Sequence, residues 1–229
     1  MSTPTQFSNM EVVTTSENQP TNGSRLAYLL GEMRRQMNGA VVGSMRFYGE
    51  EYGLNYGVSL PTIRSIARAE SEATEDAALR HRFAKLLYRQ EVRELRLAAL
   101  WLADSPLIDE ELDFWAKGII NSEVAEEAAF SLLYQSSRVE GWLDGESELL
   151  QYCALLAIAK RDEIGIESYL PRIKELMGKQ IHIIQNGVVA LLESALKKGS
   201  DRGNIESFLA SLPDGNFVRE EMSWRIEFL

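Results

Sequence analysis

Five basic side chains recur at spacings of three and four residues, which is typical of cations that share one face of a helix. They are Arg82, Lys85, Arg89, Arg93 and Arg96. A row of this kind can bind the phosphates of double-stranded DNA, so these five are the nucleic-acid-binding candidates. A helix break is expected near Gln90, and Glu91 and Glu94 offer partners within the chain. A salt-bridged protein surface is therefore the alternative interpretation.

Negative charge gathers directly downstream of this row. The 229 residues include 24 Lys and Arg against 34 Asp and Glu, a net charge of −10. Residues 104–148 hold twelve of the acidic residues and only two basic ones, so this segment accounts for the whole net charge. Such a surface repels a phosphate backbone unless its carboxylates point away from it. The segment predicts either a solvated outer face or a surface for a basic protein partner.

Helices must position these groups. Ser59 can cap a helix with Pro61 in its first turn, so one helix is expected to start at about Leu60. Thr74, followed by two acidic residues, predicts the start of a second helix. Its apolar face comprises Leu79, Phe83, Leu86 and Leu87. A third helix has Val92, Leu95, Ala99 and Leu102 on one face. The last two helices predict an antiparallel hairpin.

Helical periodicity continues along the rest of the chain. Further helices are expected from Thr21 or Ser24 to about Gln36 and over 39–51, 109–120, 122–135, 146–160, 163–178, 181–198, 203–212 and 216–229. About two helices per forty residues is the period of HEAT-type arrays. The sequence thus predicts an all-α fold, one HEAT-like repeat α-solenoid over residues 24–229, with function on its concave face. Residues 1–23 are polar and are predicted to be disordered.

Composition excludes several classes of protein. The single cysteine, Cys153, lies among Leu and Ala residues, so a buried thiol is expected rather than a nucleophile or a ligand. No metal-ligand spacing or glycine-rich phosphate loop occurs, so neither a metal nor a cofactor is expected. No apolar run approaches the length of a membrane helix, and the N-terminus does not resemble a signal peptide. A cytoplasmic protein is predicted.

Two aromatic patterns favour packing over chemistry. Tyr48, Tyr52 and Tyr56 recur every four residues, which is compatible with a platform for stacking bases but is more typical of a stripe packed on the first repeat. Trp115 shares an apolar stripe with Leu112 and Ile119, so it is expected in the core.

One stretch resembles a known family. Gly57-Val58, then Pro61 and Arg64, are followed about thirty residues later by Arg93-Glu94 and residues 98–100 (Ala-Ala-Leu). This pattern is similar to the AlkD-like DNA alkylation repair family of the HEAT-like repeat DNA glycosylase superfamily, specifically over residues 45–103 and more loosely to about residue 200. The resemblance implies a helical solenoid that acts on double-stranded DNA. It also implies aromatic side chains that hold a cationic alkylated purine and an aspartate that stabilises the developing positive sugar.

The chain departs from that family where its chemistry is expected. Glu123 and Val124 follow Ser122 in place of two tryptophans, and Ala128 stands in place of the aspartate. Further along, Tyr152 replaces an arginine and Ala190 a tryptophan.

Glu126 and Glu127 are the only weak catalytic candidates. Glu127 is one residue from the aspartate's place, which is about 100° around a helix. Both glutamates are alternatively expected to face solvent beside Glu123.

Three functions follow in order. The first is a member of this family with lost or altered glycosylase activity that still binds DNA on its concave face. The alternative is a non-enzymatic HEAT-repeat scaffold that binds a basic protein through residues 104–148. The third is an active glycosylase that excises alkylated purines.

Overall fold

The computed structural model describes residues 21–47, 52–104 and 108–228, and all its regular elements are helical. The α-helices are α1 (Asn22–Arg35), α2 (Gly39–Phe47), α3 (Leu60–Glu72), α4 (Ala77–Tyr88), α5 (Arg93–Leu102), α6 (Ile108–Ala116), α7 (Ser122–Ser131), α8 (Glu148–Lys160), α9 (Leu170–Met177), α10 (His182–Lys197), α11 (Arg202–Ala210) and α12 (Phe217–Ile226). Short 3-10 helices are η2 (Leu133–Gln135), η3 (Arg138–Asp144) and η4 (Ile166–Ser168). The predicted all-α fold is confirmed.

Capping side chains set several of the helix starts. Thr21 accepts a hydrogen bond from the Ser24 amide at the start of α1, and Ser59 accepts one from Thr62 at the start of α3. Asp76 caps α4 in the same way. These bonds satisfy amides that have no partner within the helix, so they fix where each helix begins. The expected start near Leu60 is thereby confirmed.

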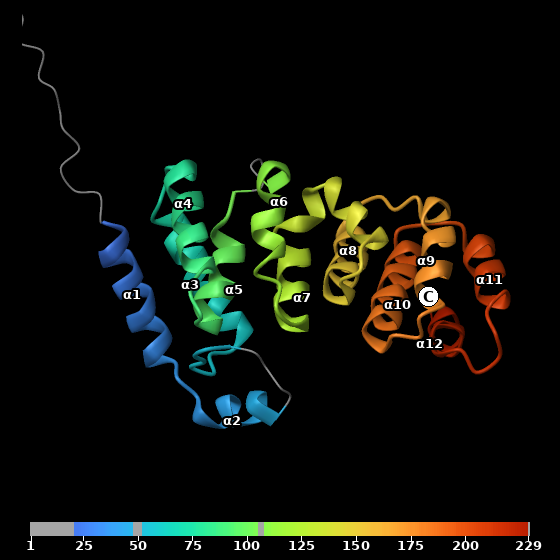
Figure 1. Cartoon of the computed structure of the whole chain (residues 1–229), viewed down its shortest axis with the longest axis horizontal. Coiled ribbons are helices and arrows are strands. Elements are labelled where there is room, and N and C mark those ends of the chain that lie inside the picture. Colours follow the sequence, from blue (N-terminus) through green and yellow to red (C-terminus); the bar gives the residue numbers. More distant parts are fainter. Residues whose placement is uncertain (1–20, 48–51, 105–107, 229) are drawn as a thin grey trace, which may run out of the picture.

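Two rows of helices run along the molecule (Figure 1). The central row comprises α3, α5, α7, α8, α10 and α12, each packed against the next. The flanking row comprises α4, α6, η3, α9 and α11. Because neighbours in sequence are neighbours in space along one axis, the arrangement is that of an α-solenoid.

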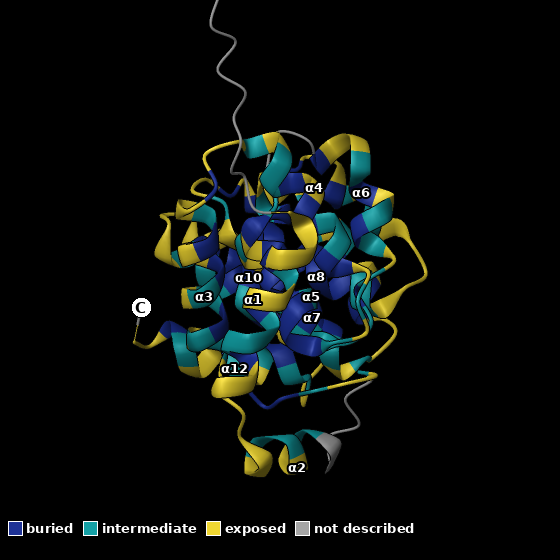
Figure 2. Cartoon of the chain, turned by 90° about the vertical axis from the view of Figure 1, so that its left-hand side faces the viewer, coloured by how far each residue is buried: buried dark blue, intermediate teal, exposed yellow. Residues whose placement is uncertain are grey.

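The core follows the central row. Figure 2 looks along the long axis and shows the buried residues gathered where α5, α7, α8 and α10 overlap. Trp115 is fully buried, as the apolar stripe predicts. Cys153 is also fully buried, and this burial raises the pKa of its thiol well above the ordinary value. The thiol therefore stays protonated and belongs to the packing.

Some expectations differ from the structure or lie outside it. The helix expected over 122–135 ends at Ser131 and continues as η2, and the η3 helix was not expected. Tyr52 and Tyr56 lie on a non-helical segment and Tyr48 lies outside the described residues, so their spacing does not make one helical stripe. Most of the segment 1–23 is likewise outside them, and its predicted disorder stays a prediction. None of the described helices is long and apolar enough to cross a membrane.

Candidate nucleic-acid interface

The α7 helix presents three carboxylates to its neighbours, and each has a different environment. Glu123, Glu126 and Glu127 recur at spacings of three and four, so they share one side of the helix. The sequence alone allows them to face solvent together. Instead, Glu127 is buried and the other two are half-buried. Their partners decide what each can do.

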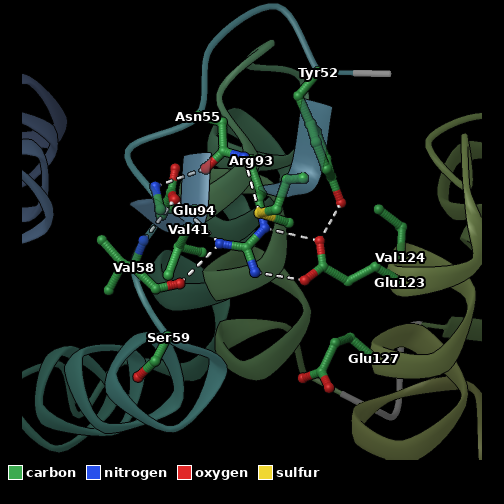
Figure 3. A network of polar contacts seen from close by, with 12 residues as sticks. Val41, Tyr52, Asn55, Val58, Ser59, Arg93, Glu94, Glu123, Val124 and Glu127 are labelled. Carbon is green, nitrogen blue, oxygen red and sulfur yellow. Dashed lines mark hydrogen bonds and ion pairs between the residues drawn. The ribbon is translucent and has the colours of Figure 1, made fainter. Parts of the chain in front are cut away.

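Glu123 is tied to α5 by Arg93 (Figure 3). The Arg93 Nε donates to Glu123 Oε2 at 2.8 Å, and a second guanidinium nitrogen donates to Oε1. The Tyr52 hydroxyl donates to the same carboxylate at 2.7 Å. Burial, with the Glu123 charge adding to it, raises the pKa of Tyr52 above its usual range. Glu123 is therefore a structural anion that joins α7, α5 and the segment before α3.

Glu94 holds that segment from the other side. Its fully buried carboxylate accepts the amides of Tyr56, at 3.1 Å, and Val58, at 3.2 Å. Arg93 donates to the Val58 carbonyl at 2.8 Å. Gly57 between them has a φ of +73°, and a Cβ there would lie 2.3 Å from the Asn38 carbonyl oxygen, so only glycine fits. This clamp fixes the turn that leads into α3.

Glu127 is neutralised by Arg64 of α3. The Arg64 Nε donates to Glu127 Oε2 at 3.1 Å, and a second guanidinium nitrogen donates to Oε1. The Trp101 indole also donates to Oε2, at 2.9 Å. The Arg64 guanidinium lies over the Trp101 ring, 5.2 Å from its centroid. A carboxylate with three donors and an exposed fraction of 3% is committed to holding α3, α5 and α7 together.

Glu126 has no such neutralisation. Its carboxylate accepts the Tyr152 hydroxyl of α8 at 2.9 Å, and no Lys or Arg in the described ranges pairs with it. Burial raises the pKa of Glu126, and the charges of Glu127 and Glu123 add to that rise, although the Tyr152 hydrogen bond opposes it. Glu126 is thus the one carboxylate of this trio with no cation beside it.

Tyr152 and two exposed rings surround this part of α7. Gly187 of α10 lets α10 pack closely against α8, because a Cβ at this position would lie 3.0 Å from the Tyr152 ring. Trp101 and Phe130 expose 37% and 39% of their surface. Phe130 is one turn along α7 from Glu126 and Glu127, so electron-rich ring faces accompany the carboxylates.

A hollow of about 440 Å³ opens beside Trp101. Its lining consists of Pro61, Arg64, Ser65, Arg68, Ser71 and Trp101. Arg68 is exposed, and within the described residues no carboxylate pairs with it. Ser65, Arg68 and Ser71 follow each other at helical spacing on α3, so a cation and two hydroxyls border an aromatic ring. This combination suits a phosphate with an adjacent base.

The five predicted basic residues are divided between two helices. Arg82 and Lys85 lie on α4 and Arg89 ends it, whereas Arg93 and Arg96 lie on α5. Arg93 is 3% exposed and committed to Glu123, and Arg96 donates to the Gly118 carbonyl at 3.1 Å. The expected break near Gln90 therefore separates three surface cations from two structural ones. Their binding to nucleic acid stays a prediction.

Much of the acidic segment is paired within the chain. Arg93, Arg64, Arg161 and Arg172 neutralise Glu123, Glu127, Glu140 and Asp144 respectively, and Lys85 and His81 share Glu111. The four arginines and Lys85 each come from another element than the carboxylate they pair with, so the negative charge of the linear sequence overstates that of the surface.

The positions matched to the resembling family are also placed. Ala128 is 1% exposed and packs inside α7, and Tyr152 is the partner of Glu126. Ala190 borders a hollow on α10. In the described part of the chain no group of three or more His, Cys, Asp or Glu side chains is arranged to hold a metal ion.

The sequence does place Arg64 and Arg68 on one face of the helix that precedes the basic row, because they are four residues apart. It gave no indication that Trp101, Phe130 and Tyr152 lie near these charged groups. Trp101 gave no such signal, since it follows an apolar run and reads as core.

Comparison with protein families supports the resemblance. The sequence model of the family described as "DNA alkylation repair enzyme" matches residues 29–217. No curated protein and no solved structure gives a significant match. The matched range spans most of the chain and contains every residue of the interface described above. The chain therefore belongs to the DNA alkylation repair enzyme family.

Proposed function

We propose that this protein binds DNA through the exposed face of α3 and α5, as a HEAT-like repeat member of its family whose glycosylase chemistry is lost or altered. The observation that carries the proposal is the hollow in which the unpaired Arg68 lies beside the exposed ring of Trp101. Arg68 supplies a cation for a phosphate, and Trp101 supplies a face for a base.

The charge balance of this face supports the proposal. Glu127 and Glu123 of α7 are both paired with arginines, and the partner of Glu127 is Arg64, which lines the hollow. A backbone phosphate at Arg68 therefore does not meet the repulsion that the acidic composition of residues 104–148 suggests. Ser65 and Ser71 add hydroxyl donors along the same helix.

The same contacts support an altered chemistry. A carboxylate that stabilises a positively charged sugar must keep its charge free for the transition state. Glu127 already accepts hydrogen bonds from Arg64 and Trp101, so its negative charge is compensated before any transition state forms. Ala128, at the place where the family resemblance implies an aspartate, is buried and uncharged.

The binding proposal is tested with a short labelled duplex in a fluorescence anisotropy titration. We expect affinity to fall steeply with salt, Arg68→Glu to weaken binding roughly tenfold, about 1.4 kcal/mol, and Trp101→Ala to weaken it further. Lys174→Glu is the matched control, because Lys174 is exposed on α9 and makes the same charge change.

Binding that Arg68→Glu and Trp101→Ala leave unchanged would overturn the proposal. No binding at low salt would overturn it as well, and would favour the alternative of a scaffold for a basic protein partner.

A second candidate function is excision of a cationic base with Glu126 as the carboxylate. It is favoured by one observation, that Glu126 has no cation partner in the described ranges while Trp101 and Phe130 are exposed nearby. Duplex DNA with methylated purines, scored for abasic sites, tests it. Release that Glu126→Gln abolishes would support this function, and the absence of release from the wild-type protein would exclude it.

A further inference from the structure

A second cationic hollow lies on the flanking row. Its volume is about 320 Å³, and its lining consists of Arg82, Lys85, Leu86, Arg89 and Gln90. All of these residues come from α4 or its C-terminal end. None of them lines the hollow beside Trp101, which is formed by α3 and α5. The two hollows therefore belong to different rows of helices.

Two of its three cations are uncommitted. Within the described residues no carboxylate pairs with Arg82 or Arg89, and both are exposed. The Arg89 guanidinium lies 5.3 Å from the centroid of the Phe114 ring, which limits where it can point. An arginine held in this way without an anion, as Arg89 is, is ready to accept one.

The third cation is held in place by its surroundings. Lys85 donates to Glu111 and lies 5.0 Å from the Phe114 centroid. The His81 Nε2 also hydrogen-bonds to Glu111, at 2.8 Å, so Lys85 shares this carboxylate with His81. Asp109, Glu110 and Asp113 are the other acidic residues of α6, the neighbouring helix of the flanking row. The hollow keeps the positive charge of Arg82 and Arg89 after Glu111 is assigned to Lys85.

The lining favours a nucleic acid backbone over an acidic peptide. A peptide interface is anchored by buried apolar side chains, and only the half-buried Leu86 is available here. Phosphate contacts need no such anchor. Arg82 and Arg89 are seven residues apart, about 10.5 Å along a helix, which is close to the rise of three base pairs at about 3.4 Å each.

We propose that α4 binds a second segment of duplex DNA, so that one protein chain holds two duplexes, one in each hollow. This inference rests on the proposed function, because the first duplex is the one at Arg68 and Trp101. The chemistry of both sites is recognition of phosphates by arginine, but only the α3–α5 hollow has an aromatic ring in its lining.

The number of duplexes per chain tests the inference. The protein is saturated with a short unmodified duplex at low salt, and the stoichiometry of the complexes is determined by sedimentation velocity. We expect two duplexes on one chain. The double variant Arg82→Glu, Arg89→Glu should keep one duplex and weaken the second binding step by at least about tenfold. Arg82→Ala with Arg89→Ala is the milder pair, with the same expected direction, and Lys174→Glu is the control.

The outcomes separate this inference from the proposed function. One duplex per wild-type chain, or two duplexes that the α4 variants leave unaffected, overturns the inference and leaves binding at Arg68 standing. Two duplexes on two chains overturns it too, in favour of a protein dimer. If Arg68→Glu leaves both steps unchanged while the α4 variants remove one, the proposed function fails and the α4 site survives.

Discussion

The central row has a hollow near each end, and the two hollows differ in whether their arginines are paired with carboxylates. The α3–α5 hollow, beside Trp101, has a volume of about 440 Å³, and the α10–α12 hollow has a volume of about 410 Å³. In the α3–α5 hollow, Arg68 has no carboxylate partner among the described residues. In the α10–α12 hollow, Arg225 pairs with both Glu193 and Glu221. Similar size and the same row thus do not give the same capacity to bind an anion.

The difference extends to the groups beneath each hollow. The α3–α5–α7 end contains two largely buried ion pairs, Arg93–Glu94 and Arg93–Glu123, whereas the pairs at the α10–α12 end are partly exposed. Buried pairs are costly to break and fix geometry, and exposed pairs contribute little. The first end is therefore built as a rigid surface and the second as an ordinary solvated one. Each prediction below tests one part of that contrast.

Removing a buried anion should have the largest effect. Glu94→Ala leaves the Tyr56 and Val58 amides without their acceptor and Arg93 short of one partner, so we expect a loss of about 3–5 kcal/mol in unfolding free energy. Arg225→Ala at the other end should cost at most about 1 kcal/mol. Urea denaturation measures both. Equal costs would show that the two ends do not differ in this way.

A glycine pair sharpens the same contrast at the level of the backbone. Gly57 and Gly199 both have positive φ, +73° and +83°, so alanine is strained at either position. Only at Gly57 would the new Cβ also meet the Asn38 carbonyl, while nothing lies within 4 Å at Gly199. We expect Gly199→Ala to cost about 1–2 kcal/mol and Gly57→Ala about 1–3 kcal/mol more. Thermal unfolding compares them, and a smaller loss at Gly57 would contradict the clamp.

Local rules predicted the helices well, because caps and apolar periodicity act within a few residues. Ser59 and Pro61 placed the start of α3 at its observed residue, and Thr74 and the break near Gln90 lie within three residues of the observed bounds of α4 and α5. The partners of the charged residues could not be predicted in the same way. Arg64 and Glu127 are 63 residues apart, and Arg93 reaches Glu123 over 30. The residues that flank each arginine and each carboxylate do not indicate which arginine pairs with which carboxylate.

The candidate site shows the same limit at the scale of one residue. Glu126 and Glu127 were both weak candidates, two residues and one residue from the expected aspartate position, and about 100° of helical rotation separates them. That rotation directs Glu127 to Arg64 and Trp101, and Glu126 to Tyr152. The packing of α3, α5 and α8 around α7 therefore decides which carboxylate keeps a free charge, and this packing is a property of the whole row.

The smallest expected effect is a change in melting temperature, and it has opposite signs for substitutions at Glu126 and at Glu127. Burial raises the pKa of Glu126, so the folded protein binds this proton more tightly than the unfolded chain does. The contribution of Glu126 to stability is then fully present below its unfolded pKa, about 4.3, and is lost as the pH rises through the folded value. Glu126→Gln keeps an acceptor for Tyr152 without the charge, so it should raise the melting temperature at pH 7.

Two control variants show whether a rise in melting temperature is specific to Glu126→Gln. Glu127→Gln removes the charge that Arg64 needs, so it should lower the melting temperature at pH 7. Glu146→Gln, at an exposed position, should leave it nearly unchanged. The gain from Glu126→Gln should shrink as the pH falls toward 4, because the wild-type carboxyl is then protonated as well. A loss of stability for Glu126→Gln at pH 7 would mean that a cation compensates this carboxylate, and Glu126 would then be a structural anion like Glu127.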